Sequence, residues 1–174
     1  MTDNSPMENI VLRIAEAGDI PALERIATAM KAVHEENYFE RSLGDGRTIL
    51  LAEQAGRAVA YVQINWKPLY APFRRFGLPE IQDLNTVPGA RRQGIGARMV
   101  SWCEDYARQR GHADIGISVG LAASYGAAQR LYVRLGYVPD GAGACYDDVP
   151  VQPGARYAAD DLFTLKLVKS LGAG

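Results

Sequence analysis

Residues 81–98, read IQDLNTVPGARRQGIGAR, constrain the fold more than any other part of the chain. They continue a strand-like run over residues 80–87, pass through a short turn containing proline and glycine, and enter an amphipathic helix near Gly94. Gly94 and Gly96 have no Cβ, so the backbone can come close to a ligand there. The first turn of a helix has unpaired N–H groups and a partial positive charge. The stretch therefore predicts a phosphate-binding site at the start of a helix.

Two known kinds of phosphate loop do not fit this pattern. A dinucleotide-binding loop has a third glycine where this chain has Met99, and it follows its strand immediately. A nucleotide triphosphate loop requires Gly-Lys-Ser or Gly-Lys-Thr, which is absent here. Instead, Arg91 and Arg92 precede the glycines and add positive charge at the rim.

Composition indicates one globular domain. The chain has 174 residues, of which 48% are hydrophobic and 22% charged, and its net charge is −1. This charge argues against nucleic acid or an anionic membrane surface as a general partner. Cys103 and Cys145 have no metal-ligand spacing, so we expect no metal site and a reducing, cytoplasmic location. No apolar run approaches the ~20 residues of a membrane span. We expect a loose tail over residues 1–9 and the domain over residues 10–174.

Local patterns predict a mixed α/β chain built around one sheet. We expect a helix from Asp19, a helix over residues 31–43 and a long loop over residues 67–79 that lies near the site. A mainly irregular segment is expected over residues 139–158. The remaining predicted elements are strands at 11–14, 48–53, 57–66, 80–87, 114–119, 137–138 and 162–168, and helices at 94–110 and 124–135.

Two blocks of the sequence together resemble the GNAT superfamily of N-acetyltransferases. The first is RRQGIG at residues 91–96, which follows a strand that ends in Val87-Pro88. The second is YGAAQRLYVRLGY at residues 125–137, which is similar to the closing helix of the family. One helix and one strand separate the blocks, as in the family, and the resemblance covers roughly residues 11–140 and the final strand.

The resemblance implies a fold, an activity and a co-substrate. The fold is a single GNAT-like α/β domain whose mixed, mostly antiparallel, twisted sheet is flanked by helices and splays at the acetyl-CoA cleft. The activity is transfer of an acetyl group from acetyl-CoA to a primary amine by direct attack in a ternary complex. The residues that the resemblance assigns to cofactor binding are Asn85, Thr86, Val87, Arg91, Arg92, Gln93, Gly94, Ile95, Gly96, Ala97, Tyr125 and Tyr132.

Catalytic roles follow partly from the resemblance and partly from chemistry. Tyr132 matches the family tyrosine that protonates the departing thiolate, whereas Tyr125 replaces a family asparagine that contacts the cofactor. The amine must lose a proton before it attacks, and Glu80 and Asp83 are candidate general bases. In a regular strand they point to opposite faces, so we prefer Asp83, and a bulge would change that parity. His34 is a further candidate, although a structural role is the commoner one for such a residue.

The acceptor and the oligomeric state stay open at the sequence level. An aminoglycoside-like compound, a polyamine, an amino acid and a protein N-terminus all remain candidates, and the aromatic segment at residues 66–76 favours a small molecule. Two other functional classes also remain: a catalytically idle acyl-CoA-binding sensor or interaction module, and a nucleotide-phosphate-binding protein. Many members of the resembled family dimerise, which leaves a homodimer open.

Overall fold

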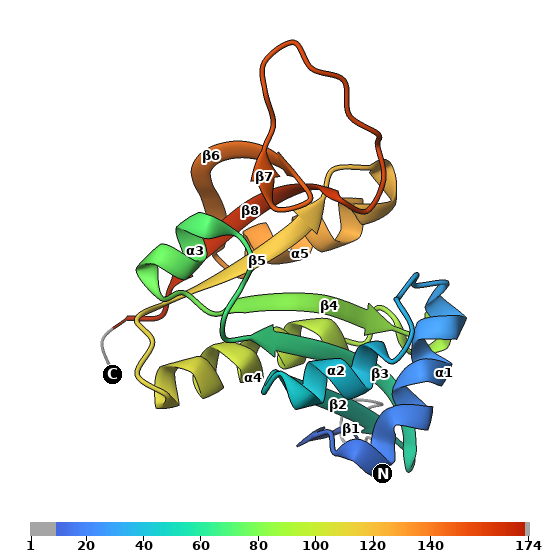
Figure 1. Ribbon diagram of the computed structural model, residues 1–174. Coiled ribbons are helices and arrows are strands. Elements are labelled where there is room, and N and C mark those ends of the chain that lie inside the picture. The colour runs from blue at the N-terminus through green and yellow to red at the C-terminus, as the bar shows by residue number, and fades with distance from the viewer. Residues whose placement is uncertain (1–9, 173–174) are drawn as a thin grey trace. The chain divides into compact units, whose positions relative to one another are not determined.

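A computed structural model describes residues 10–172 (Figure 1). The tail predicted over residues 1–9 lies outside the described part. Within it, eight strands form one open sheet in the order β1-β2-β3-β4-β5-β8-β6-β7. The strands are β1 (Ile10–Ile14), β2 (Thr48–Gln54), β3 (Arg57–Asn65), β4 (Glu80–Thr86), β5 (Asp114–Gly120), β6 (Val138–Tyr146), β7 (Val149–Pro150) and β8 (Phe163–Ser170). The helices are α1 (Ile20–Met30), α2 (Tyr38–Gly44), α3 (Ala71–Phe76), α4 (Ile95–Gln109) and α5 (Gly126–Arg134).

The pairing of the strands confirms the predicted mixed, mostly antiparallel sheet flanked by helices. β1 with β2, β2 with β3, β5 with β8, and β6 with both β7 and β8 are antiparallel. β4 and β5 are parallel and pair only where Glu80 faces Gly116 and Ile81 faces Ile117. The chain divides into two compact units, and the division falls inside β4 and inside α4. The opening of the sheet beyond Ile81 stays a prediction.

The first unit comprises residues 10–65 and Gln82–Cys103. Its hairpin of β2 and β3 turns at Ala55 and Gly56, both of which have positive φ (50° and 73°), as a tight two-residue turn requires. α1 and α2 cover one face of these strands (Figure 1). That face is an apolar core of eight buried residues: Ala15, Leu23, Ile26, Ala27, Phe39, Ile49, Leu51 and Tyr61. Burial of such side chains contributes about 1.5–3 kcal/mol each to folding, so this core fixes the position of α2 on the strands.

The second unit comprises Trp66–Ile81 and residues 104–172. β5 pairs with β8 over seven residue pairs, from Asp114 with Ser170 to Gly120 with Thr164. Tyr70, Phe73 and Cys145 form its buried cluster. Gly116 on β5 packs so closely against α3 that a Cβ on it would lie 2.2 Å from the Phe73 ring. Close packing therefore requires a glycine at this position. Backbone conformation does not require it, since this residue is not in the left-handed region.

Three predicted segments were wrong in detail. The helix predicted over residues 31–43 begins only at Tyr38, because Lys31 ends α1 in the left-handed conformation (φ 55°) and Asn37 adopts it again (φ 56°). The loop predicted over residues 67–79 contains α3, which ends at Gly77. The irregular segment predicted over residues 139–158 contains most of β6 and all of β7, because β8 supplies the hydrogen-bond partners.

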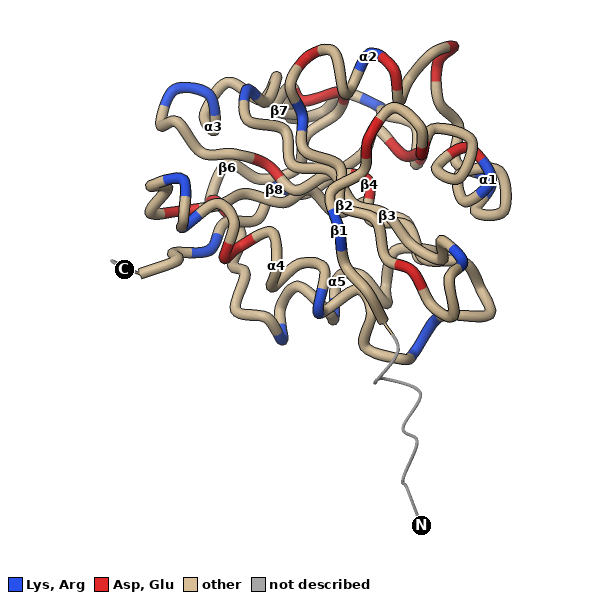
Figure 2. Tube along the Cα trace, turned by 90° about the horizontal axis from the view of Figure 1, so that it is seen from below, with Lys and Arg blue, Asp and Glu red and all other residues tan. Residues whose placement is uncertain are grey.

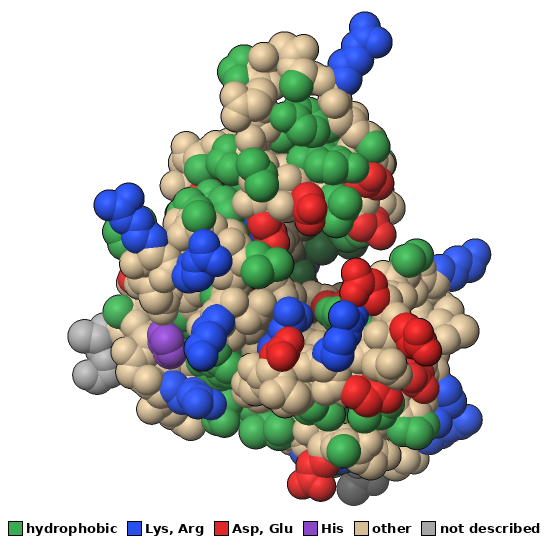
Figure 3. All heavy atoms as spheres, viewed as in Figure 1, with side chains coloured by type: hydrophobic (Ala, Val, Ile, Leu, Met, Phe, Trp, Pro, Cys, Tyr) green, Lys and Arg blue, Asp and Glu red, His purple; other side chains and the backbone are tan. Residues whose placement is uncertain are grey.

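Charged side chains are distributed without a field of one sign. Lys and Arg positions and Asp and Glu positions are both scattered over the traced chain (Figure 2), and both signs are interspersed on the face drawn in Figure 3. No helix in residues 10–172 is long and apolar enough to cross a membrane.

Candidate active site

The segment that the sequence predicts to bind phosphate lies between β4 and α4 in the first unit. A short 3₁₀ turn over Pro88–Ala90 follows β4, and Arg92 and Gly94 then adopt positive φ (60° and 75°). Arg98 donates its backbone N–H to the Gly94 carbonyl at 3.1 Å, which is the first hydrogen bond of α4. The N–H groups of the residues between them therefore have no acceptor inside the helix. Such a group of donors at a helix start suits the pyrophosphate of a CoA molecule.

Side chains around this turn hold its shape. Arg91 donates from Nε to the Thr86 carbonyl at 3.0 Å, so it is tied to the end of β4. Gln93 donates to the Gly89 carbonyl at 3.2 Å and accepts from Gln54 Nε2 at 2.8 Å. The sequence analysis missed Gln54, which has no local relation to the turn. These contacts brace the loop from two sides.

Asp83 lies at the centre of a polar cluster in the first unit. Its Oδ1 accepts a hydrogen bond from Asn85 Nδ2 at 2.6 Å, and its Oδ2 accepts one from Gln63 Nε2 at 3.3 Å. His34 Nε2 is 3.3 Å from the same Oδ2. His34 also contacts the Tyr61 hydroxyl at 3.1 Å. The carboxylate is thus surrounded by polar groups that come from β3, from β4 and from the segment before α2.

Aromatic rings enclose the same cluster. The His34 ring stacks on the Tyr38 ring with centroids 4.0 Å apart and planes within 2°. The Tyr38 hydroxyl accepts a hydrogen bond from Gln63 Nε2 at 3.0 Å, and Tyr61 is fully buried. The sequence indicated His34 as a candidate, whereas the roles of Tyr61 and Gln63 were not predicted. Their alternation along the β3 sequence was the available signal.

The backbone and electrostatics of Asp83 are unusual. Its φ is 57°, so the regular alternation of β4 is interrupted at this residue. Burial raises the pKa of the Asp83 carboxyl above its ordinary value, although the His34 charge and hydrogen bonds from Tyr61, Tyr38 and Gln63 oppose this shift. A carboxylate whose pKa is raised by burial is a stronger proton acceptor than a solvated one.

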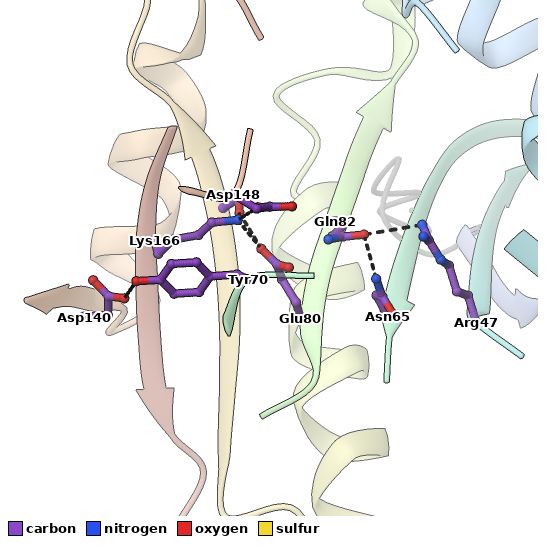
Figure 4. A network of polar contacts seen from close by, with 9 residues as sticks. Arg47, Asn65, Tyr70, Glu80, Gln82, Asp140, Asp148 and Lys166 are labelled. Atoms are coloured by element: carbon purple, nitrogen blue, oxygen red, sulfur yellow. Dashed lines mark hydrogen bonds and ion pairs between the residues drawn. The ribbon is translucent and has the colours of Figure 1, made fainter. Parts of the chain in front are cut away.

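Glu80, the other predicted base, belongs to an ion-pair cluster in the second unit. It is fully buried, and Lys166 Nζ lies 3.0 Å from its Oε1 (Figure 4). Lys166 also contacts Asp148, and it donates to Ser118 Oγ at 2.6 Å. Burial lowers the pKa of Lys166, but the charges of Glu80 and Asp148 outweigh it and raise the pKa overall. Lys166 was missed, although a lysine inside the apolar run LFTLKLV was a visible signal.

The two predicted tyrosines also lie in the second unit. Tyr132 on α5 is 5% exposed, and burial raises the pKa of its hydroxyl, so it stays protonated at neutral pH. The Tyr125 ring lies against Gly120, where a Cβ would come within 2.4 Å of it, and its hydroxyl donates to Asp161 at 2.5 Å. Gln129 Nε2 donates to the Gly120 carbonyl at 2.8 Å. Tyr125 and Gln129 are therefore anchored on the end of β5.

Comparison with known proteins decides the family. The model of the Acetyltransferase (GNAT) family matches residues 18–137, well over half of the chain. The protein belongs to the GNAT acetyltransferase family. A comparison with curated protein sequences finds no match.

Several solved structures share the GNAT fold. The ribosomal-protein-S18-alanine N-acetyltransferase of Escherichia coli has a TM-score of 0.70 and 20% identity, covering 93% of this chain and 94% of that one. YncA of Salmonella typhimurium, solved with its cofactor acetyl-CoA, has a TM-score of 0.68 and 20% identity, covering 96% of each chain. The N-acetylglutamate synthase of Neisseria gonorrhoeae, solved with coenzyme A and N-acetyl-glutamate, has a TM-score of 0.67 and 17% identity, covering 94% of this chain and 35% of that one. At these identities the likeness establishes the fold, and the acceptor has to be argued from this chain's own residues.

Proposed function

We propose that this GNAT protein transfers the acetyl group of acetyl-CoA to a primary amine of a small-molecule acceptor, by direct attack while both substrates are bound. The observation that carries the proposal is the Asp83 cluster: a partly buried carboxylate in an interrupted strand, ringed by His34, Tyr38 and Tyr61. Burial raises the pKa of this carboxyl. A general base benefits from it, because a raised pKa brings the group closer to the working pH.

In this proposal, each group of residues has a separate role. The backbone N–H groups of Ile95, Gly96 and Ala97 hold the pyrophosphate, and residues 85–87 hold the pantetheine arm. Acetyl-CoA supplies the activated acetyl group as a thioester. Asp83 accepts a proton from the acceptor's ammonium, and His34, 3.3 Å away, passes it toward solvent.

The bond changes then balance. The neutral amine nitrogen forms the new bond to the carbonyl carbon, the carbon–sulfur bond breaks, and the electron pair leaves with the sulfur. The nitrogen also gives up its second proton, which restores the Tyr132 hydroxyl through solvent after that hydroxyl has protonated the sulfur. Tyr132 donates its hydroxyl proton to that sulfur, a role suited to a phenol that burial keeps protonated. Glu80 is not needed as a base, because Lys166 and Ser118 already occupy its Oε1.

Structural neighbours with this fold are associated with different acceptors. The acceptor class is therefore proposed from the residues of this chain. One neighbour is named for alanine of a ribosomal protein, and another was solved with N-acetyl-glutamate. The cytoplasmic location and a homodimer are proposed on the same footing, from the chain's composition and the family resemblance.

A thiol-release assay tests the proposal. Acetyl-CoA is incubated with aminoglycosides, polyamines, amino acids and peptides, and products are identified by mass spectrometry. We expect thiol release that depends on an amine, together with an acetylated product. If CoA binds in calorimetry but no amine yields an acetylated product, the protein is an acyl-CoA-binding module and the proposal fails.

A further inference from the structure

One face of the first unit carries a row of polar side chains beneath α2. Gln63 pairs in register with Ile49, and Ile49 belongs to the core that α1 and α2 cover, so Gln63 lies on the covered face. Arg47 directly precedes β2, and its guanidinium reaches Gln82 on β4. Figure 4 shows Arg47 and Asn65 both directed at Gln82. The neighbouring residue along β4 is Asp83.

The guanidinium of Arg47 is partly buried but has no carboxylate partner among the described residues. It is half-buried, and its contact to Gln82 Oε1 is 3.5 Å long, which is beyond the usual range for a hydrogen bond. Within residues 10–172 it forms no ion pair with a carboxylate. Arg13 and Arg41 in the same unit each pair with a carboxylate at 2.7 Å and 2.6 Å. A planar guanidinium with unused donors matches a carboxylate or another planar anion.

The other end of the row has one buried acceptor without a donor, next to the Asp83 carboxylate. Gln63 is fully buried, its Nε2 is bonded to Tyr38 and Asp83, and its Oε1 has no hydrogen-bond partner among the described residues. A buried carbonyl of this kind destabilises the protein when it stays without a hydrogen bond. Together with the Asp83 carboxylate, it matches a ligand that donates several N–H bonds. An ammonium group does so.

Tyr38 connects the two ends. Burial raises the pKa of the Tyr38 hydroxyl, the Asp83 charge raises it further, and the Arg47 charge lowers it. Contacts connect the two ends as well: Gln63 Nε2 donates to the Tyr38 hydroxyl at 3.0 Å and to Asp83 at 3.3 Å, and Gln82, which Arg47 contacts, is next to Asp83 along β4. A ligand that reaches both ends has its own negative and positive groups a short distance apart.

Resting on the proposed acetyl transfer, we infer that the acceptor is an amino acid, an amine that carries a carboxylate on the same small molecule. Arg47 binds the carboxylate, and Asp83 and Gln63 receive the ammonium. A polyamine places a second cation beside Arg47, where like charges repel. The amine at the end of a peptide has an amide in place of the nearby carboxylate and leaves Arg47 without a partner.

The test compares free amino acids with their carboxamides in the wild-type protein and in Arg47→Gln. We expect the wild type to prefer the free carboxylate, and Arg47→Gln to lose about 10- to 100-fold in kcat/KM for free amino acids, mainly through KM, because one charge-assisted contact is removed. Carboxamides lose nothing in that variant. Arg41→Gln is the matched control, since Arg41 is exposed and pairs with Glu35. Arg47→Lys restores part of the preference, and thermal melting shows that each variant is folded.

Calorimetric titration with free amino acids and carboxamides, in the presence of CoA, gives a readout independent of turnover. Acetylated products without a preference for the carboxylate, or equal behaviour of Arg47→Gln and Arg41→Gln, overturn the inference while the proposed function stands. If no amine is acetylated, the proposed function fails. The inference then fails with it, because it names the acceptor of that transfer, and carboxylate-dependent binding that Arg47→Gln removes would show only an amino-acid ligand at this site.

Discussion

Replacing Asp83 by Asn is expected to reduce activity strongly without weakening the fold. The amide has nearly the same shape as the carboxyl and can still accept from Asn85 or Gln63, which contact Asp83 at 2.6 Å and 3.3 Å. It cannot accept the proton of the ammonium. Since a positioned general base contributes about 10²- to 10⁴-fold, Asp83→Asn should lower kcat by that factor and leave the KM for acetyl-CoA nearly unchanged.

The pH dependence of stability follows from the direction in which folding shifts the pKa of the Asp83 carboxyl. Burial raises the folded-state pKa of Asp83 above the unfolded value of about 3.9. The native state therefore holds this proton more tightly than the unfolded state does. As pH rises from the unfolded pKa to the folded pKa, the contribution of Asp83 to the free energy of unfolding falls by about 1.4 kcal/mol per pH unit. Above the folded pKa the penalty is fully present. Asp83→Asn avoids it and should melt at the same or a higher temperature than the wild type at neutral pH.

Two measurements check this reasoning. Initial rates of thiol release against pH should show wild-type kcat/KM falling as pH drops through the raised pKa of Asp83. Melting curves across the same pH range should show the advantage of Asp83→Asn disappearing in acid. Asp45→Asn is the control, because Asp45 is an exposed carboxylate that follows α2. Retained activity in Asp83→Asn, or a lower melting temperature at every pH, would show that Asp83 only supports the structure.

Three further changes test other parts of the molecule. Tyr132→Phe should lower kcat with little change in the KM for acetyl-CoA, because it removes only the hydroxyl; unchanged turnover would exclude Tyr132 as the acid. Gly94→Val should raise the Kd for CoA in calorimetry, since a β-branched residue does not tolerate a φ of 75°, and unaltered binding would place CoA elsewhere. Gly116→Ala should lower the melting temperature by about 2–12 °C, because its Cβ would meet the Phe73 ring at 2.2 Å, whereas Gly18→Ala, with nothing within 4 Å, should melt like the wild type.

The phosphate loop could be predicted because its determinants are local. Glycine spacing, the preceding strand and the following amphipathic helix all lie within 18 residues of sequence, and the positive φ of Gly94 is the conformation that glycine supplies. The hairpin at Ala55 and Gly56 was predictable for the same reason. The extent of β6 was not predictable. The glycines and proline of VPDGAGACY favour turns, and the strand forms through pairing with β8, with a register shift between Pro139 and Ala144.

The long-range partners of charged groups could not be predicted from the sequence either. Glu80 and Lys166 are 86 residues apart, and nothing local indicates that one neutralises the other. The consequence for function is direct. Of the two carboxylates that the sequence offered as bases, one has a buried cation at 3.0 Å and the other does not. Choosing between them required the packing of β4 against β8's side chains within the second unit.

The two backbone irregularities that sequence reasoning could not anticipate concern the same carboxylate. The segment KAVHEEN lacks glycine and proline and has helical composition, yet it leaves the helix at Lys31 so that His34 stacks on Tyr38 and reaches Asp83. Asp83 itself takes a left-handed φ, which costs about 1–2 kcal/mol for a residue with a Cβ. Local preferences are normally satisfied where only the fold is at stake. Their joint violation beside the partly buried Asp83 carboxylate supports the proposal that this site performs chemistry.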